Sequence, residues 1–277
     1  MRDSAAVLDL QNVFPAIGTK IDKFQLSDSR VLEWGSRRWR LLQEILLHQP
    51  DIVCLQEVDH YNFISSALAS IGYSGQFCPK PDSACCYVDG NSGPDGCAIL
   101  FKTDKFELLS SDSKVLTAWQ SATNQVVLGL VLRHKSGKEV CAVTSHLKAR
   151  KGSLLASIRD EQGQDLMAWL EEFRAGRSVI LSGDFNAEPS EEVYQTLTTD
   201  KNIVLGSSYD NSNLDYTTWK IRDTGEEKQV LDYIFHSDDL RTLKTLDVPS
   251  EEEVGDQRLP SLAYASDHLS LVADIHI

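Results

Sequence analysis

Basic residues are scarce in this sequence. Its 277 residues include 27 Lys and Arg against 41 Asp and Glu, so the formal net charge is −14. Proteins that bind nucleic-acid polymers without sequence preference do so through a basic surface. A nucleic-acid polymer is therefore a poor default ligand unless a local cluster of cations overrides the total charge, and we expect no binding to DNA.

Paired cysteines and long apolar runs are also missing. The 6 cysteines form no C-x-x-C pair, and Cys54, Cys97 and Cys141 lie in apolar, strand-like runs, as buried reduced thiols do. No run is long enough to span a membrane, and the N-terminal residues do not resemble a signal or transit peptide. We expect an intracellular protein that does not bind membranes: cytoplasmic, or mitochondrial if a longer form carries a targeting segment.

Repeats, low-complexity tracts and linkers are absent too, which favours one domain over residues 1–277. Apolar periodicity predicts strands near 52–55, 97–101, 126–133, 139–145, 178–183, 230–235 and 269–275. It predicts helices from Ser36 to His48, from 63 to 72, around 166–173 and at 191–197, with loops at 78–96 and 202–229. This alternation predicts an α/β protein, a four-layer sandwich of two packed mixed β-sheets flanked by helices.

Acidic side chains stand at the ends of several strand-like runs. The segments are 51–57, 182–188, 231–234 and 266–268, and they contain Glu57, Asp184, Asp232 and Asp267. Gathered acids do not stabilise a soluble protein, because they repel one another and resist burial. A bound divalent cation removes that objection, and oxygen ligands with one histidine suit Mg²⁺ or Mn²⁺. The pattern therefore predicts a metal-dependent phosphoesterase.

The G-D-F-N motif at 183–186 is the most informative of these segments. Asp184 and Asn186 are two residues apart, so both can point to the same side of a strand. Asp184 could deprotonate or align a water molecule, while Asn186 could donate to a phosphoryl oxygen. An Asx turn between strand and helix is the alternative. Beside Glu57 and His268, the catalytic interpretation is favoured.

Histidines and cations complete this set. His268 could donate a proton to developing phosphate charge if a carboxylate such as Asp232 raised its pKa, and a satisfied core histidine is the alternative. The strand-like run ending at His146 is followed by Lys148, Arg150 and Lys151, and Lys80 stands between two prolines. A solvated charge run is the bland interpretation. A concentrated positive spot in an acidic protein, however, suits one or two phosphates.

These residues carry a family resemblance. Glu57, His146, Asp184-x-Asn186, Asp232 and Asp267-His268 occur in the order found in the endonuclease/exonuclease/phosphatase superfamily. Longer segments are similar to the nocturnins, which are related to the deadenylase branch of that superfamily. They are CLQEVDH (54–60), FCPKP (77–81), GPDGC (93–97), TNQV (123–126), HLKAR (146–150), GDFNAEP (183–189), YTTWKIR (216–222) and RLPS (258–261).

The resemblance implies a DNase I-like fold and a set of roles. Mg²⁺, with Mn²⁺ as an alternative, is expected at Glu57, with Asp267 and Asn12 as further metal-site residues. Asp184, Asn186, His146 and His268 are implied to form the catalytic wall, with Asp232 orienting His268. Lys80, Lys148 and Arg150 are implied to grip the substrate phosphates. Trp219 could stack on adenine or belong to the core.

The resemblance also implies the activity. Nocturnins are associated with removal of the 2′-phosphate of NADP⁺ and NADPH, and with biological rhythms; the related deadenylases are 3′-to-5′ exoribonucleases of poly(A). The charge argument favours the dinucleotide, because a poly(A) tail needs a basic track. We expect a monomer acting on NADP(H), with poly(A) RNA as the alternative substrate. A degenerate scaffold that binds a partner is the remaining, non-enzymatic alternative.

The N-terminal strand departs from the family pattern. The family places its metal-site Asn in a Gln-Trp-Asn-Ile-Leu context, whereas this chain has Leu8-Asp-Leu-Gln-Asn-Val-Phe14. Asn12 takes that place only if the following loop is one residue shorter, and an ungapped match puts Gln11 there. Residues 1–14 are therefore expected to form a divergent first strand, and loss of the Asn would weaken support for the metal.

Overall fold

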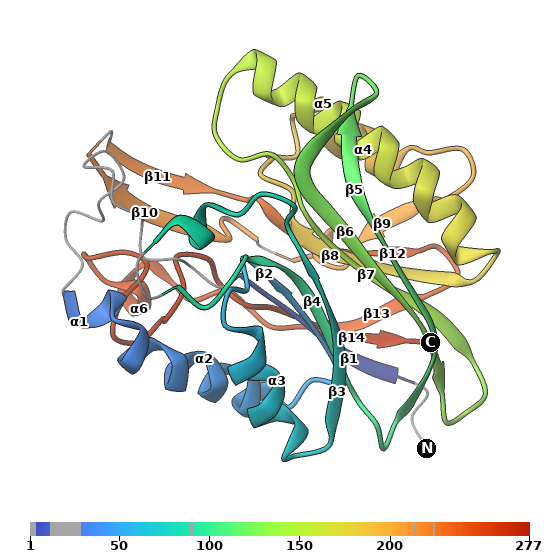
Figure 1. The fold of residues 1–277 in the computed structure, drawn as a ribbon, viewed down its shortest axis with the longest axis horizontal. Helices are drawn as coiled ribbons and strands as arrows, with labels where there is room; N and C mark the ends of the chain where they lie inside the picture. The colour runs from blue at the N-terminus through green and yellow to red at the C-terminus, as the bar shows by residue number, and fades with distance from the viewer. Residues whose placement is uncertain (1–3, 12–28, 89–90, 213, 224) are drawn as a thin grey trace.

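Two six-stranded β-sheets form the centre of the molecule (Figure 1). The computed structural model describes residues 4–11, 29–88, 91–212, 214–223 and 225–277. In spatial order the first sheet contains β13 (Arg241–Thr245), β14 (Leu271–His276), β1 (Ser4–Gln11), β2 (Ile52–Gln56), β4 (Gly96–Lys102) and β3 (Tyr73–Pro79). The second contains β5 (Phe106–Ala118), β6 (Ser121–His134), β7 (Glu139–His146), β8 (Ser178–Asp184), β12 (Asp232–Ser237) and β9 (Leu205–Ser207).

Helices cover the outer faces of both sheets (Figure 1). The first sheet is covered by α2 (Trp34–His48) and α3 (Tyr61–Ala69), and the second by α4 (Ser153–Arg174) and α5 (Glu192–Thr198). Short helices are α1 (Ser29–Leu32), a 3-10 turn (Ala84–Tyr87) and α6 (Glu251–Val254). The predicted four-layer α/β sandwich is confirmed. In the part of the chain that the structure describes, we find no helix with the length and apolarity to cross a membrane.

Successive side chains of each central strand point to opposite faces of the sheet, and both faces are buried. On β2, Ile52 and Cys54 point into the core between the sheets, while Val53 and Leu55 pack under α2 and α3. The same period of two recurs on the other central strands. A strand that is buried on both faces reads as a continuous apolar run, which is why the sequence shows these strands clearly.

Several predicted boundaries are wrong. Helix α2 begins at Trp34 with Glu33 at its N-cap position, so Ser36 lies inside the helix. The stretch 202–229, expected to be a loop, contains β9 and a two-stranded hairpin of β10 (Thr218–Arg222) and β11 (Gly225–Gln229). The hairpin lies outside the two large sheets, and its polar sequence hides its strand character (Figure 1).

The pairing directions decide where functional side chains can meet. Strands β1 and β2 pair in parallel, and so do β7 and β8. The carboxyl ends of each parallel pair therefore lie at the same edge of their sheet, as in other α/β sites. Asn12, which would follow β1 at this edge, lies outside the described residues.

Candidate active site and metal centre

The acids predicted from the sequence converge at one edge of the sandwich. In the second sheet, Asp184 is the register neighbour of both His146 on β7 and Asp232 on β12. Glu57 follows β2 in the first sheet, and its Oε1 lies 3.9 Å from His146 Nδ1. One residue before Glu57, a buried hydrogen bond joins the two sheets: Gln56 Nε2 donates to Thr144 Oγ1 at 2.9 Å. The site therefore spans both sheets.

Unusual backbone conformations aim the side chains at this edge. Glu57 has φ 51° and Asn186 has φ 52°, values that L-residues seldom adopt. Gly183 is required, because a Cβ there would stand 2.1 Å from the carbonyl oxygen of Ser145. Backbone strain of this kind clusters at functional sites.

Asp184 and Asn186 form the Asx turn that was the alternative interpretation of their motif, and their catalytic role stays a prediction. The Asn186 N–H donates to Asp184 Oδ1 at 2.8 Å, which is an Asx turn, and Asn186 Nδ2 donates to the Leu147 carbonyl at 3.2 Å. The turn holds the Asp184 carboxylate among the other acids. Burial, followed by the charge of Asp232, raises the pKa of Asp184 to about 7.

His268 is held by the carboxylate that the sequence suggested. Its Nδ1 lies 2.8 Å from Asp232 Oδ2, and Thr217 Oγ1 donates to the same oxygen at 2.5 Å. Burial alone would lower the pKa of His268, but the Asp232 carboxylate outweighs it and the pKa rises to about 9. Asp232 therefore favours the cationic form of His268 and fixes the orientation of its ring from one side.

Lys220 is a member of the site that sequence reasoning missed. It projects from β10, is 7% exposed, and its Nζ donates to Asp267 Oδ2 at 2.8 Å and contacts His268 Nε2 at 3.3 Å. Burial favours the neutral form of Asp267, yet Lys220 and the other cations hold the pKa of Asp267 well below its usual range. The expected loop at 202–229 concealed this lysine, because it lies in a strand, β10, whose Thr218 pairs with His268.

The donor set fits a divalent cation. Burial raises the pKa of the Glu57 carboxyl to about 7, and neither ring nitrogen of buried His146 has a hydrogen-bond partner among the described residues. The pKa of His146 is lowered well below its usual value by burial and by Lys80. Two carboxyls that resist ionisation beside a neutral histidine are stabilised when a hard cation binds them.

The position of that cation follows from the existing contacts. Asp184, Asp232 and His268 offer ligand atoms within 4.8 Å of one another. Asp232 and His268, however, are hydrogen-bonded to each other, and Asp267 forms an ion pair with Lys220. Glu57 and Asp184 are thus the carboxylates best placed to hold a metal, and a metal-ligand role for Asp267 stays a prediction.

Two of the three predicted phosphate-binding cations, Lys80 and Lys148, border the acid cluster, by which we mean Glu57, His146, Asp184, Asp232, Asp267 and His268. Lys80 follows β3 and its Nζ lies 2.6 Å from Asp95 Oδ2; burial lowers the pKa of Lys80, but Asp95 and Glu57 raise it above its ordinary value. Lys148 is half-buried and Arg150 is exposed, both in the segment that follows β7. Lys80 and Lys148 both lie close enough to His146 to lower its pKa.

Trp219 belongs to the core. The indole is 5% exposed, with the Arg258 guanidinium carbon 4.0 Å and Lys228 Nζ 4.3 Å from its ring centroid. Its Nε1 donates to Glu226 Oε1 at 2.7 Å. The proposed stacking of Trp219 on a base is therefore wrong for this conformation, because the ring is buried and already in contact with two cations.

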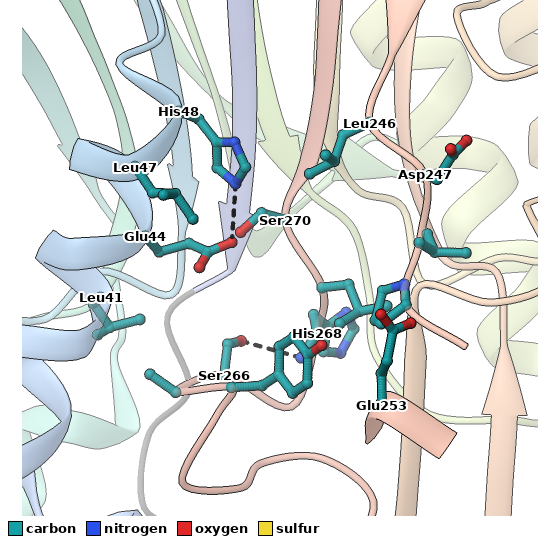
Figure 2. A pocket seen from close by; sticks show the side chains of 15 residues that line it. Leu41, Glu44, Leu47, His48, Leu246, Asp247, Glu253, Ser266, His268 and Ser270 are labelled. Atoms are coloured by element: carbon teal, nitrogen blue, oxygen red, sulfur yellow. Dashed lines mark hydrogen bonds and ion pairs between the residues drawn. The ribbon is translucent and has the colours of Figure 1, made fainter. Parts of the chain in front are cut away.

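A separate cavity of about 330 Å³ lies between α2 and residues 246–249 and reaches His268 and Ser266 (Figure 2). Glu44 and His48 face it from α2, paired at 3.5 Å. Its described lining residues include acids but no Lys or Arg. The cavity is thus poorly suited to phosphate, and the acid cluster with its bordering cations is the better site.

Comparison with known proteins identifies the arrangement. The sequence profile of the Endonuclease/Exonuclease/phosphatase family matches residues 24–268. Nocturnin of Xenopus laevis is 43% identical over 270 residues, which is 94% of this chain and 69% of that protein. This chain is a nocturnin-type member of the endonuclease/exonuclease/phosphatase family. It therefore belongs to a family of enzymes that hydrolyse phosphoesters.

Solved structures agree with this family assignment. The catalytic domain of human nocturnin with a bound sulfate anion superposes with a TM-score of 0.82 at 38% identity, covering 99% of this chain and 95% of that one.

The exoribonuclease subunit Ccr4 of Debaryomyces hansenii is more distant, at 25% identity over 94% of this chain and 37% of its own length. The nocturnin-type chain spans 47% of the Drosophila melanogaster nocturnin and 62% of the human one.

Proposed function

We propose that this chain is a Mg²⁺-dependent phosphohydrolase that removes the 2′-phosphate of NADP⁺ and NADPH, with Mn²⁺ as an alternative metal. The observation that most supports this proposal is a small set of cations, Lys80, Lys148 and Arg150, that accompanies the acid cluster in a chain of net charge −14. A dinucleotide phosphate needs only a compact cationic spot. A polymer of phosphodiesters needs a basic track that this composition does not favour.

The metal would be held by Glu57 and Asp184. When bound there, Mg²⁺ would neutralise charge that develops on the phosphoryl group in the transition state. Asn12 would add an amide oxygen if it occupies the end of β1, and Asp267 would neutralise Lys220 or contribute to the metal site.

The reaction is an attack of water on the 2′-phosphorus with departure of the ribose 2′-oxygen. Asp184 aligns the water; its pKa of about 7 belongs to the metal-free carboxyl, because a bound Mg²⁺ would hold the carboxylate ionised. The His268 cation and the Asn186 amide donate to phosphoryl oxygens as their charge grows. His146 lies between Glu57 and Asp184, where a neutral ring can donate or accept a hydrogen bond without adding charge.

The direct test measures phosphate release from NADPH and NADP⁺ by the purified chain, with Mg²⁺ and with EDTA. NADH, which lacks the 2′-phosphate, is the matched control. We expect stoichiometric phosphate and NADH from NADPH only when Mg²⁺ is present. Absence of turnover on both cofactors, in a protein that is folded by circular dichroism, would overturn the proposal.

A poly(A) exoribonuclease is the second possibility, and the Ccr4 likeness favours it. A labelled oligo(A) ladder under the same metal conditions separates the two activities. We expect no shortening of the ladder, because a net charge of −14 does not favour the basic track that a poly(A) tail needs. NADPH binding without phosphate release would instead support the scaffold interpretation.

A further inference from the structure

The segment that carries Lys148 and Arg150 is held by its backbone. Leu147 N–H donates to the Asp184 carbonyl at 3.0 Å, and Asn186 Nδ2 donates to the Leu147 carbonyl. Lys148 N–H donates to Gln162 Oε1 of α4 at 3.0 Å. These bonds reach from the catalytic motif on one side and from α4 on the other, so they fix the path of the chain between them.

Arg159 of α4 holds the same segment, and we call this set of hydrogen bonds to the backbone of residues 147–150 the clamp. Its Nη1 donates to the carbonyls of Lys148, at 3.0 Å, and Arg150, at 2.8 Å. Its Nε and Nη2 both donate to Glu191 Oε2, at 3.1 and 2.6 Å. The side chain is 2% exposed. A planar guanidinium can serve an acid and two carbonyls at once, which an ammonium cannot.

The geometry of Arg150 shows why the segment needs such a clamp. Arg150 has φ 80°, in the left-handed region that a residue with a Cβ avoids. A strained conformation persists only when contacts around it over-determine it. The bond from Arg159 to the carbonyl of that same residue is such a contact. Glu191 keeps the guanidinium paired, so the clamp does not bury an uncompensated charge.

We propose that Arg159 is a positioning residue for substrate phosphate binding, acting through the backbone of residues 147–150. It sets where Lys148 and Arg150 present their cations to a phosphate on the acid cluster. The kinetic effect that we expect rests on the proposed function, because that function assigns Lys148 and Arg150 to the phosphates of NADP(H). Arg159 itself does not touch the substrate.

The kinetic test compares Arg159→Met with Arg174→Met. Arg174 lies at the far end of the same helix, pairs with Glu171 and donates to backbone carbonyls as well, so it controls for loss of a structural arginine. We expect Arg159→Met to raise KM for NADPH about 10- to 100-fold while kcat changes by less than about threefold. Arg159→Lys should recover part of the loss. A fall in kcat at constant KM, or an equal effect in Arg174→Met, would overturn the proposal.

A coupling cycle tests whether Arg159 acts through the two cations. In a Lys148→Ala/Arg150→Ala background, adding Arg159→Met should raise KM by no more than about twofold, because the groups that it positions are gone. Independent, multiplicative effects would show instead that Arg159 stabilises the fold at large.

Hydrogen exchange gives a readout that does not depend on NADPH. Amides of residues 147–152 should exchange at least about tenfold faster in Arg159→Met than in the wild type, and those near 171–177 should not change. If the wild type fails to hydrolyse NADPH, the proposed function fails while exchange still decides the clamp. Unchanged exchange at 147–152 contradicts the clamp whatever the substrate. Arg159→Lys serves in the same assay if Arg159→Met does not fold.

Discussion

The acid cluster and the cation-bearing segment 147–150 are built in different ways. In the acid cluster the functional side chains hold each other: Asp232 orients His268, and Lys220 pairs with Asp267. In segment 147–150 it is the backbone that forms hydrogen bonds, with α4 and with the motif at 183–186. Fixed side chains are suited to charge that develops in a transition state, whereas a fixed backbone with longer side chains is suited to gripping a substrate.

The difference has a kinetic consequence. Groups that act on transition-state charge change kcat when removed, and groups that hold substrate and transition state alike change KM. Variants of the acid cluster should therefore lower kcat, and variants of segment 147–150 should raise KM.

Glu57→Ala should give the largest loss. The metal then has no carboxylate from the first sheet, so we expect Mg²⁺-dependent phosphate release to fall at least about 10³-fold in kcat. Glu107→Ala is the control, because Glu107 is a largely exposed acid on β5 that pairs with Arg133. Steady-state kinetics over a Mg²⁺ series measures both variants. Retained activity in Glu57→Ala, with an unchanged melting temperature, would remove Glu57 from the metal site.

Asp232→Asn should cost about 10²-fold in kcat with KM little changed. The amide cannot stabilise the His268 cation, so the pKa of about 9 falls toward its ordinary value and the ring loses its orientation. Asp239→Asn controls for removing an acid near the other end of β12, where Asp239 bonds Ser237. Kinetics from pH 6 to 9 checks the result. A loss confined to KM would place His268 with the binding groups and break the comparison.

Lys148→Ala should raise KM for NADPH about tenfold and change kcat less than threefold, because one charge-assisted contact to phosphate is lost. The effect should shrink as salt is added. Lys151→Ala is the matched control, since Lys151 is 64% exposed and pairs with Glu227 at 3.0 Å. Equal effects of the two variants would show that segment 147–150 contributes only general positive charge.

The same contrast explains what the sequence could reveal. Acids at the ends of buried strands are visible, because a continuous apolar run marks the strand and parallel pairing brings the ends together. Asp184, Asp232 and His268 were found in this way, and the structure places them in contact.

Residues that are placed by polar contacts, without apolar periodicity around them, were not visible in the sequence. Lys220 lies beside His268 because Thr218 of the polar strand β10 pairs with His268, and Arg159 reaches Lys148 from a helix whose pattern shows only its apolar stripe. Trp219 was left open between a base platform and the core, and tertiary packing buries it. The tertiary contacts that decide all three cases leave no periodic signal in the sequence.

The smallest predicted effect concerns stability, and its sign follows from Glu57 and Asp184. Their pKa values of about 7 lie above the ordinary 4.5 and 3.8, so their stabilising contribution is complete below those values and is lost as pH rises through 7. Mg²⁺ binds the deprotonated carboxylates, so its own stabilisation grows over the same window. We expect Mg²⁺ to raise Tm by about 5 °C at pH 8 and by less than about 1 °C at pH 5.

Differential scanning calorimetry with Mg²⁺ or EDTA measures this effect, and Glu57→Ala should remove most of the shift at pH 8. Asp267 does not contribute to this pH dependence between pH 5 and pH 8, because its lowered pKa keeps its carboxylate ionised over that range. Equal Mg²⁺ shifts at pH 5 and pH 8 would mean that the ion binds carboxylates of ordinary pKa elsewhere. In that case the raised pKa values would mark general acids or bases without a metal partner, and the acid cluster would lose the feature that most separates it from segment 147–150.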